Sequence, residues 1–155
     1  QTWCSSDLIR FTLSRAGIPV FVDMRKSILE NPFVEMIRAG GSGLGGVVTP
    51  TGVGTLVEKN ELTHCKITID GRDYLIMKPL RADFALLSGA RVDKNGNVWY
   101  RGTTRNFQPW MAMAADTVIV EAEELVEPGA IPPEDVITPG ILVDYIVVRG
   151  GGHNG

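Results

Sequence analysis

The sequence predicts an α/β domain built on an open, mostly parallel sheet, with flanking helices and an inserted β-hairpin. Short apolar runs rich in β-branched residues alternate along the chain with segments of helical spacing. An Asp-Gly dipeptide joins two runs in which apolar and polar residues alternate, which indicates a hairpin. The 18 glycines and 9 prolines gather between these runs, so the connections are tight. We therefore expect a mixed sheet in which parallel strands predominate.

Two helices and one strand are predicted before residue 40. Ser5-Ser6-Asp7 can cap a helix from Leu8 to Arg15, and Ile18–Val22 has the composition of a short apolar strand. A second helix is predicted from Pro32 to Ala39, because proline suits the first turn of a helix and two glycines follow the last residue. The chain would then enter a long loop.

The middle of the chain predicts the hairpin and the first strand of the main sheet. His64–Ile69 and Tyr74–Met77 alternate in polarity and are joined by residues 70–73, which contain the Asp-Gly turn signal. Asp83–Leu87, apolar after its first residue, is typical of a buried parallel strand. Asn95-Gly96 marks a turn, after which Trp99-Tyr100 continues as a strand.

The C-terminal part alternates again between helix and strand. Pro109–Ala115 can form a short helix with Asn106 as its N-cap, and Thr117–Glu121 is a β-branched strand. Pro132–Val136 opens a single helical turn, and Ile141–Val148 is the predicted final strand.

Composition excludes several classes of function. The formal charge of −3 gives no basic surface for nucleic acid, and no apolar run is long enough to cross a membrane. The start is no signal peptide, and it lacks an initiating Met, so we expect the chain to begin inside a longer product. Cys4 and Cys65 have no metal-ligand spacing, which favours incidental free thiols and a cytoplasmic protein.

The glycine loop, defined here as Gly40–Thr55, contains a GxGxxG pattern at residues 41–46. A dinucleotide fingerprint needs a strand before this pattern and a helix after it, whereas here a helix precedes it and Thr49-Pro50 follows. Binding of a nicotinamide cofactor is therefore disfavoured. Two interpretations stay open: a helix end with a plain connection, or a loop that approaches a ligand or another chain through its backbone.

Several polar residues invite a chemical interpretation. Paired carboxylates can do acid–base work, but the run of four glutamates before Pro128 favours a solvated strand end; these are Glu121, Glu123, Glu124 and Glu127. His64 and His153 have no neighbours that suggest a triad or a metal site, so no metal is expected. Arg105 and Asn106 are candidates for positioning a substrate, since a guanidinium pairs with a carboxylate. A structural ion pair is the alternative.

Residues 37–55 read Ile-Arg-Ala-Gly-Gly-Ser-Gly-Leu-Gly-Gly-Val-Val-Thr-Pro-Thr-Gly-Val-Gly-Thr. They closely resemble the central motif of the α-subunit of family I coenzyme A transferases. That family includes the acetate/acetoacetate and 3-oxoacid enzymes. The resemblance continues through residues 80–83, 90–100, 104–109, 120–129 and 138–144. Several blocks in one order, spread over Val34–Val148, are more specific than any single motif. We expect a family-like domain over residues 34–150, an N-terminal segment 1–33 that does not match, and a tail at residues 151–155.

The resemblance implies a ping-pong exchange of CoA between carboxylic acids through a glutamyl-CoA thioester. In the family that glutamate belongs to a Ser-Glu-Asn-Gly motif on the β-subunit, and the motif is absent here, so no catalytic residue is expected in this chain. The family's N-terminal Gly-Gly-Phe type signature is also missing from residues 1–33. The implied partners are a β-subunit that supplies the glutamate, in an α2β2 hetero-oligomer, together with acyl-CoA and carboxylic acids. Coenzyme A is expected as a substrate, with no permanently bound cofactor.

On this resemblance, part of the glycine loop is expected to line the CoA site or the subunit interface; these residues are Gly43, Gly45, Gly46, Thr49, Thr51, Gly52 and Gly54. The competing interpretation is that the loop serves only to fold the α-subunit. A different class of function is a catalytically silent ligand-binding or regulatory domain of the same broad fold, because fold alone does not fix function. A third interpretation is a fragment that folds by itself but acts only after assembly with its partner.

Overall fold

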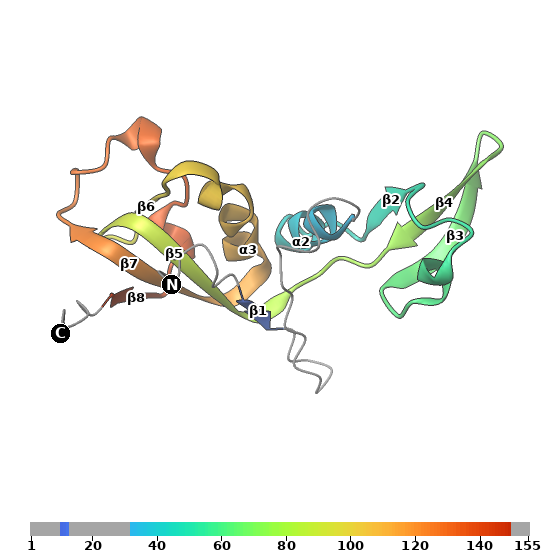
Figure 1. Cartoon of the computed structure of the whole chain (residues 1–155), viewed down its shortest axis with the longest axis horizontal. Coiled ribbons are helices and arrows are strands. Elements are labelled where there is room, and N and C mark those ends of the chain that lie inside the picture. The colour runs from blue at the N-terminus through green and yellow to red at the C-terminus, as the bar shows by residue number, and fades with distance from the viewer. Residues whose placement is uncertain (1–9, 13–31, 150–155) are drawn as a thin grey trace, which may run out of the picture.

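The computed structural model describes residues 10–12 and 32–149, which form two β-sheets, two α-helices and four short 3₁₀ turns (Figure 1). The larger sheet contains β1 (Arg10–Thr12), β5 (Ala82–Asp93), β6 (Val98–Trp99), β7 (Ala115–Val126) and β8 (Tyr145–Val148). The smaller sheet contains β2 (Val47–Thr49), β3 (Thr63–Ile69) and β4 (Arg72–Met77). The helices are α2 (Phe33–Gly41) and α3 (Gln108–Ala114), and the 3₁₀ turns are η2 (Leu56–Lys59), η3 (Gly102–Asn106), η4 (Pro133–Asp135) and η5 (Gly140–Leu142).

The larger sheet is mixed, as expected. Its strand order is β1-β5-β7-β8, with β6 paired to β5. The pairings β5–β7 and β7–β8 are parallel, whereas β1 and β6 run antiparallel to β5. The connection from β6 back to β7 runs through η3 and α3, which gives the strand–helix–strand unit of an α/β fold. The predicted fold class is confirmed.

The core lies between this sheet and the helices, on one face only of β5 and β7. Ala85 pairs with Val118 and Leu87 with Val120, and all four are buried. Phe84 and Leu86, which alternate with Ala85 and Leu87 along β5, point to the opposite face, where Phe84 is 48% exposed. The parallel strand predicted at residues 83–87 is confirmed, but over these residues it is buried on one face only. A run of apolar residues cannot reveal which face is covered, since neighbouring side chains on a strand point to opposite sides.

Helix α2 joins the two sheets and packs beside α3. Met36, Ile37 and Ala39 are buried on its inner face, and the guanidinium of Arg38 lies 5.5 Å from the ring centroid of Trp110 on α3. Pro32 is the residue before the first helical turn, and the helix continues through the two glycines to Gly41. The predicted helix is confirmed, two residues longer at its end.

The smaller sheet projects from the other side of α2, away from β8 (Figure 1). We call residues Val47–Met77 the arm. Its strand order is β2-β4-β3, and both pairings are antiparallel. The hairpin turn is Asp70-Gly71, with φ of 51° and 76°, and two positive φ values are what a type I′ turn requires. The predicted hairpin is confirmed, and Leu75 on β4 is buried under η2 and its loop.

Some local predictions were wrong. Residues 10–12, predicted as helix, form strand β1, because the free edge of β5 offers backbone partners that local propensity cannot register. The glycine loop contains strand β2, since residues 47–49 pair with β4. Residues 140–142 form a 3₁₀ turn, so the last strand is shorter than predicted. The strand predicted at residues 18–22 lies outside the described residues.

Candidate functional site

The glycine loop lies on the surface between α2 and the arm. Gly45 is exposed, and a β-carbon built there would meet no atom within 4 Å. Its neighbour Gly46 differs, because a β-carbon there would lie 2.8 Å from the carbonyl oxygen of Met77. Within residues 32–149, no backbone or side-chain oxygen accepts the amide N–H of Gly45. This part of the loop therefore offers open backbone, with a donor that is free to bind another molecule.

Three large apolar side chains are exposed in and beside the loop, among exposed polar residues such as Ser42 and Thr51. Leu44 is 58% exposed, Val48 on β2 is 49% exposed, and Leu56 at the start of η2 is 86% exposed. Scattered exposed apolar residues are ordinary on protein surfaces, but three within thirteen consecutive positions, 44 to 56, resemble a contact region more than a solvated one. The loop thus combines accessible backbone with apolar side chains that nothing in the described structure covers.

The second half of the loop is held by hydrogen bonds. The hydroxyl of Thr55 donates to the carbonyl oxygen of Gly52 at 2.7 Å and accepts the amide N–H of Val57 at 3.2 Å. The amide N–H of Gly54 donates to Oε1 of Glu58 at 2.7 Å. Because Gly54 has a φ of 78°, a side chain there would be strained, so glycine is required by the backbone.

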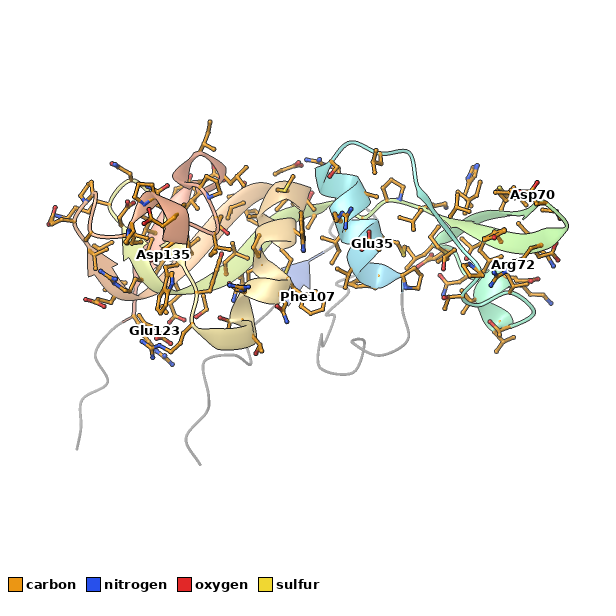
Figure 2. The ribbon with its side chains drawn as sticks, turned by 90° about the horizontal axis from the view of Figure 1, so that it is seen from above. Glu35, Asp70, Arg72, Phe107, Glu123 and Asp135 are labelled. Atoms are coloured by element: carbon orange, nitrogen blue, oxygen red, sulfur yellow. The ribbon has the colours of Figure 1, made fainter. Side chains whose placement is uncertain are left out.

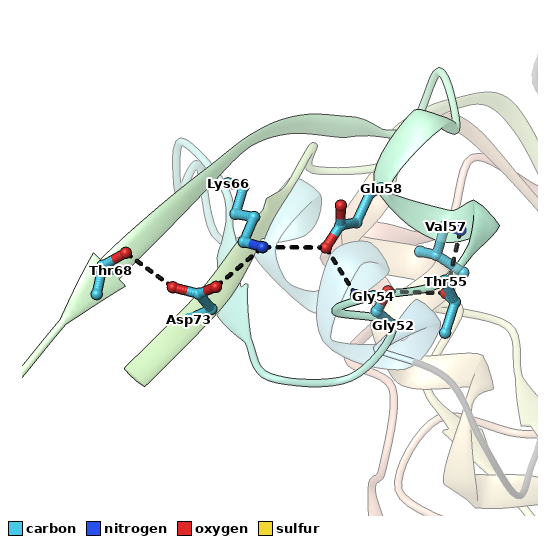
Figure 3. A network of polar contacts seen from close by, with 8 residues as sticks. All are labelled: Gly52, Gly54, Thr55, Val57, Glu58, Lys66, Thr68 and Asp73. Atoms are coloured by element: carbon cyan, nitrogen blue, oxygen red, sulfur yellow. Dashed lines mark hydrogen bonds and ion pairs between the residues drawn. The ribbon is translucent and has the colours of Figure 1, made fainter. Parts of the chain in front are cut away.

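Glu58 belongs to a polar network that reaches into the hairpin (Figure 3). The Nζ atom of Lys66 lies 3.4 Å from Oε1 of Glu58 and 2.9 Å from Oδ2 of Asp73. The hydroxyl of Thr68 donates to Oδ1 of Asp73 at 2.8 Å. The hydrogen bond from Gly54 is the main cause that lowers the pKa of Glu58, and the hydrogen bond from Lys66 is the main cause that lowers the pKa of Asp73. Asp73 in turn raises the pKa of Lys66.

This network was not predicted from the sequence, although the sequence contains one signal of it. Thr55-Leu56-Val57-Glu58 has the spacing of a capping box, in which a threonine caps a helical turn and a glutamate three residues later bonds a backbone amide. Thr55 does cap η2, but Glu58 bonds Gly54, one residue before the cap. No spacing rule links Glu58 to Lys66 or Asp73, since only the folding of the hairpin brings them together.

The two loop threonines are placed differently. Thr49 is buried, and its side-chain oxygen accepts the amide N–H of Thr51 at 3.1 Å. Thr51 itself is exposed. Thr49 is therefore placed to support the loop from inside, whereas Thr51 is exposed, as are Gly43, Gly45 and Gly54.

Arg105 and Asn106 lie on η3, a different element from the glycine loop. Both are exposed, and no ion pair or hydrogen bond with another described residue occupies the guanidinium of Arg105. The predicted cap at Asn106 is wrong: α3 is preceded by Phe107, and no side chain caps its start. Among the described residues, no hydrogen bond or ion pair joins these two residues to the glycine loop.

The acidic cluster is engaged in surface ion pairs at the larger sheet. Glu124 lies 3.7 Å from Arg91, Glu127 pairs with Lys94, and Glu123 lies 3.8 Å from Arg149. Figure 2 shows Glu123 and Asp135 at the end of the molecule opposite Asp70 and Arg72 at the arm tip. These contacts fit the interpretation of a solvated strand end.

In the part of the chain that the structure describes, no group of three or more His, Cys, Asp or Glu side chains is arranged to hold a metal ion. Neither of its helices is long and apolar enough to span a bilayer. Cys65 is exposed as a free thiol on β3.

Comparison with known proteins places the chain in a family. The α-subunit of an acetoacetyl-CoA:acetate/butyrate CoA transferase from Clostridium acetobutylicum is 57% identical over 118 residues, which cover 76% of this chain and 53% of that protein. The acetate CoA-transferase subunit alpha of Escherichia coli K12 is 48% identical over 119 residues, covering 77% and 53%. This chain thus spans about half the length of the curated relatives it matches.

The fold agrees with these relatives. Glutaconate coenzyme A-transferase from Acidaminococcus fermentans superposes with a TM-score of 0.67 at 20% identity, over 75% of this chain and 43% of that one. The family model described as Coenzyme A transferase matches residues 26–149, which include the glycine loop, the arm and all of the larger sheet except β1. The chain belongs to the coenzyme A transferase family.

Proposed function

We propose that this chain is part of the α-subunit of a short-chain acyl-CoA transferase, which moves CoA between carboxylic acids of the acetate/acetoacetate or 3-oxoacid type. The observation that carries the proposal is the family match, which runs through the whole glycine loop. One α-subunit of the family is 57% identical to this chain over 118 residues. The partner is a β-subunit, and the proposed assembly contains two copies of each subunit. The chain contributes residues 34–150 as the family domain.

The proposed reaction proceeds through the β-subunit. The carboxylate of its glutamate attacks the acyl-CoA thioester carbonyl, which forms a mixed anhydride and releases CoA thiolate. The thiolate then attacks the glutamyl carbonyl carbon, releasing the acyl group as a carboxylate and leaving an enzyme–CoA thioester. The acceptor carboxylate reverses both steps. Covalent transfer conserves the thioester bond energy, provided that water is kept from the intermediates.

The proposed role of this chain is to close and shape the shared site with its glycine loop. The amide N–H of Gly45 is free to stabilise a developing oxyanion or a bound carboxylate. The exposed Leu44 and Leu56 suit a surface that another subunit covers and keeps dry. Arg105 and Asn106 are proposed to position a carboxylate or CoA group. A reducing compartment such as the cytoplasm fits the exposed free thiol of Cys65.

Two neighbouring glycines test the proposal. Gly45→Val adds atoms where no neighbour lies within 4 Å, so the chain should fold normally while transfer from acetoacetyl-CoA to acetate falls. Gly46→Val forces atoms against the carbonyl of Met77, so it should lower stability. The assay uses the chain co-produced with a β-subunit that carries the Ser-Glu-Asn-Gly motif. Unchanged kinetics for Gly45→Val would favour a loop that serves only folding.

The absence of any transfer by the wild-type complex would instead favour the second class of function, a ligand-binding or regulatory domain. That alternative would be supported if calorimetry detected binding of acyl-CoA while no turnover occurred.

A further inference from the structure

Gly54 is fixed by a hydrogen bond rather than by packing. It is exposed, and a β-carbon built there would meet no atom within 4 Å, so no side chain packs against its free face. Its φ of 78° nevertheless places it in a defined left-handed conformation. The 2.7 Å bond from its amide to Glu58 is the side-chain contact that holds it. The shape of the loop at this point therefore depends on where the carboxylate of Glu58 stands.

Glu58 is in turn anchored to the hairpin. Lys66 on β3 bridges Glu58 and Asp73, and Asp73 on β4 also accepts the hydroxyl of Thr68. Thr68 and Asp73 are directly paired across the two strands, so the anchor is part of a regular ladder. A continuous series of contacts therefore runs from the hairpin to the backbone of Gly54 (Figure 3).

Stability alone does not account for this arrangement. The side chains of Lys66, Asp73 and Glu58 are 43%, 41% and 29% exposed, and exposed ion pairs contribute little to folding. The network does fix the direction in which the carboxylate of Glu58 points, because Lys66 is held by two carboxylates and Glu58 is bonded to both the loop and the hairpin. Each member favours its charged form, since the pKa of Lys66 is raised and the pKa values of both acids are lowered.

We propose that Glu58 is a positioning residue for the glycine loop, oriented by Lys66 and Asp73, and that efficient CoA transfer requires it. The inference rests on the proposed function, in which this loop faces the reacting groups. Glu58 does not touch them; it sets the conformation of Gly54 and so the course of the loop. Small displacements of positioned groups cost up to about 100-fold in rate.

The experiment compares variants in the complex with the β-subunit. Glu58→Ala removes the acceptor for Gly54, and kcat should fall by roughly 10- to 100-fold, with KM for acetoacetyl-CoA changing much less. Glu58→Gln keeps an oxygen that can accept from Gly54 but loses its charge toward Lys66, so it should recover part of the loss. Lys66→Met should resemble Glu58→Gln. Glu61→Ala and Lys59→Met, at exposed neighbours outside the network, should match wild type.

Hydrogen–deuterium exchange of the same complexes provides a readout independent of turnover. Glu58→Ala should speed exchange in peptides covering residues 50–58, while peptides from α2 and β7 stay unchanged. Wild-type kcat in Glu58→Ala, or equal losses in Glu61→Ala, would overturn the proposal. Unchanged exchange at residues 50–58 would overturn it as well. If the wild-type complex transfers no CoA, the proposed function fails, while the exchange result still decides whether Glu58 holds the loop.

Discussion

The carbonyl oxygen of Leu80 lies against Gly40 so closely that a β-carbon at Gly40 would be 1.8 Å from it. This contact joins the end of α2 to the start of β5, and thus the arm to the larger sheet. Arg81 strengthens the joint, because its guanidinium donates to the carbonyl of Gly40 at 3.2 Å and to Asp116 at 2.9 Å. The orientation of the glycine loop relative to the sheet depends on this contact.

Gly40→Ala should therefore destabilise the chain strongly. A methyl group cannot be accommodated without moving the backbone of Leu80, which we expect to cost about 3 kcal/mol or more in the free energy of unfolding. Urea denaturation followed by circular dichroism measures the change. Gly45→Ala, at an open position of the same loop, is the matched control and should alter stability by less than about 1 kcal/mol. Equal stability of the two variants would show that the joint is not rigid.

Tyr100 should make stability fall in alkaline solution. Its hydroxyl bonds Thr138 at 2.7 Å in the core, and burial raises the pKa of Tyr100 from 10.0 to about 12. A raised pKa means that the folded state holds the proton more tightly than the unfolded state. The stabilisation is therefore complete below pH ~10 and is lost as pH rises toward ~12, by about 3 kcal/mol in total.

The variant Tyr100→Phe isolates this effect. At neutral pH it should be less stable than wild type by about 1–2 kcal/mol, because Thr138 loses its buried partner. Its stability should then decline less between pH ~10 and ~12, since no hydroxyl titrates. Urea unfolding across this range gives both curves. Parallel curves would show that Tyr100 does not carry the pH dependence.

Arg105 should affect substrate binding without affecting the fold. Its exposed guanidinium has no partner among the described residues, so Arg105→Ala should leave the melting temperature unchanged. If the residue positions a carboxylate or a CoA phosphate, KM should rise by roughly 10-fold, which corresponds to about 1.4 kcal/mol. Arg101→Ala is the control, because Arg101 is 74% exposed and lies 3.9 Å from Glu123. The same KM in both variants would remove Arg105 from the site.

The acidic cluster should be dispensable for transfer. Glu124 and Glu127 are 64% and 73% exposed and pair with Arg91 and Lys94 at the surface. Glu124→Gln and Glu127→Gln should keep wild-type kcat and change stability by at most about 1 kcal/mol each. Steady-state assays of the reassembled complex give kcat. A loss of 100-fold or more in either variant would assign these acids a role that their ion pairs do not suggest.

Elements with strong local signals could be predicted from the sequence. The turn at Asp70-Gly71 requires two positive φ values, which this pair adopts more readily than most others, so the hairpin was predictable. Helix α2 has a clear apolar face and a proline at its start. The strands around Leu87 and Val120 are rich in apolar and β-branched residues, although their full lengths emerge only from pairing.

Features that depend on distant partners could not be predicted. Strand β1 forms because β5 has an open edge, and β2 forms because β4 lies beside the loop. The exposure of Phe84 reflects a sheet face without a covering helix in the described structure, which the apolar run itself cannot reveal. The loop was identified as a candidate site by resemblance. The contact between Glu58 and Lys66, which supports the loop, forms only when the hairpin folds, because the two residues are more than five positions apart in sequence.

The location of the covalent intermediate tests the proposed division of roles between this chain and its β-subunit. The complex of this chain with its β-subunit would be mixed with acetoacetyl-CoA in the absence of acceptor acid, quenched in acid, and both chains weighed by intact-protein mass spectrometry. We expect a CoA thioester on the β-subunit and an unmodified mass for this chain. A CoA adduct on this chain, or full transfer by this chain alone, would contradict the claim that it shapes a site whose reactive carboxylate comes from a partner.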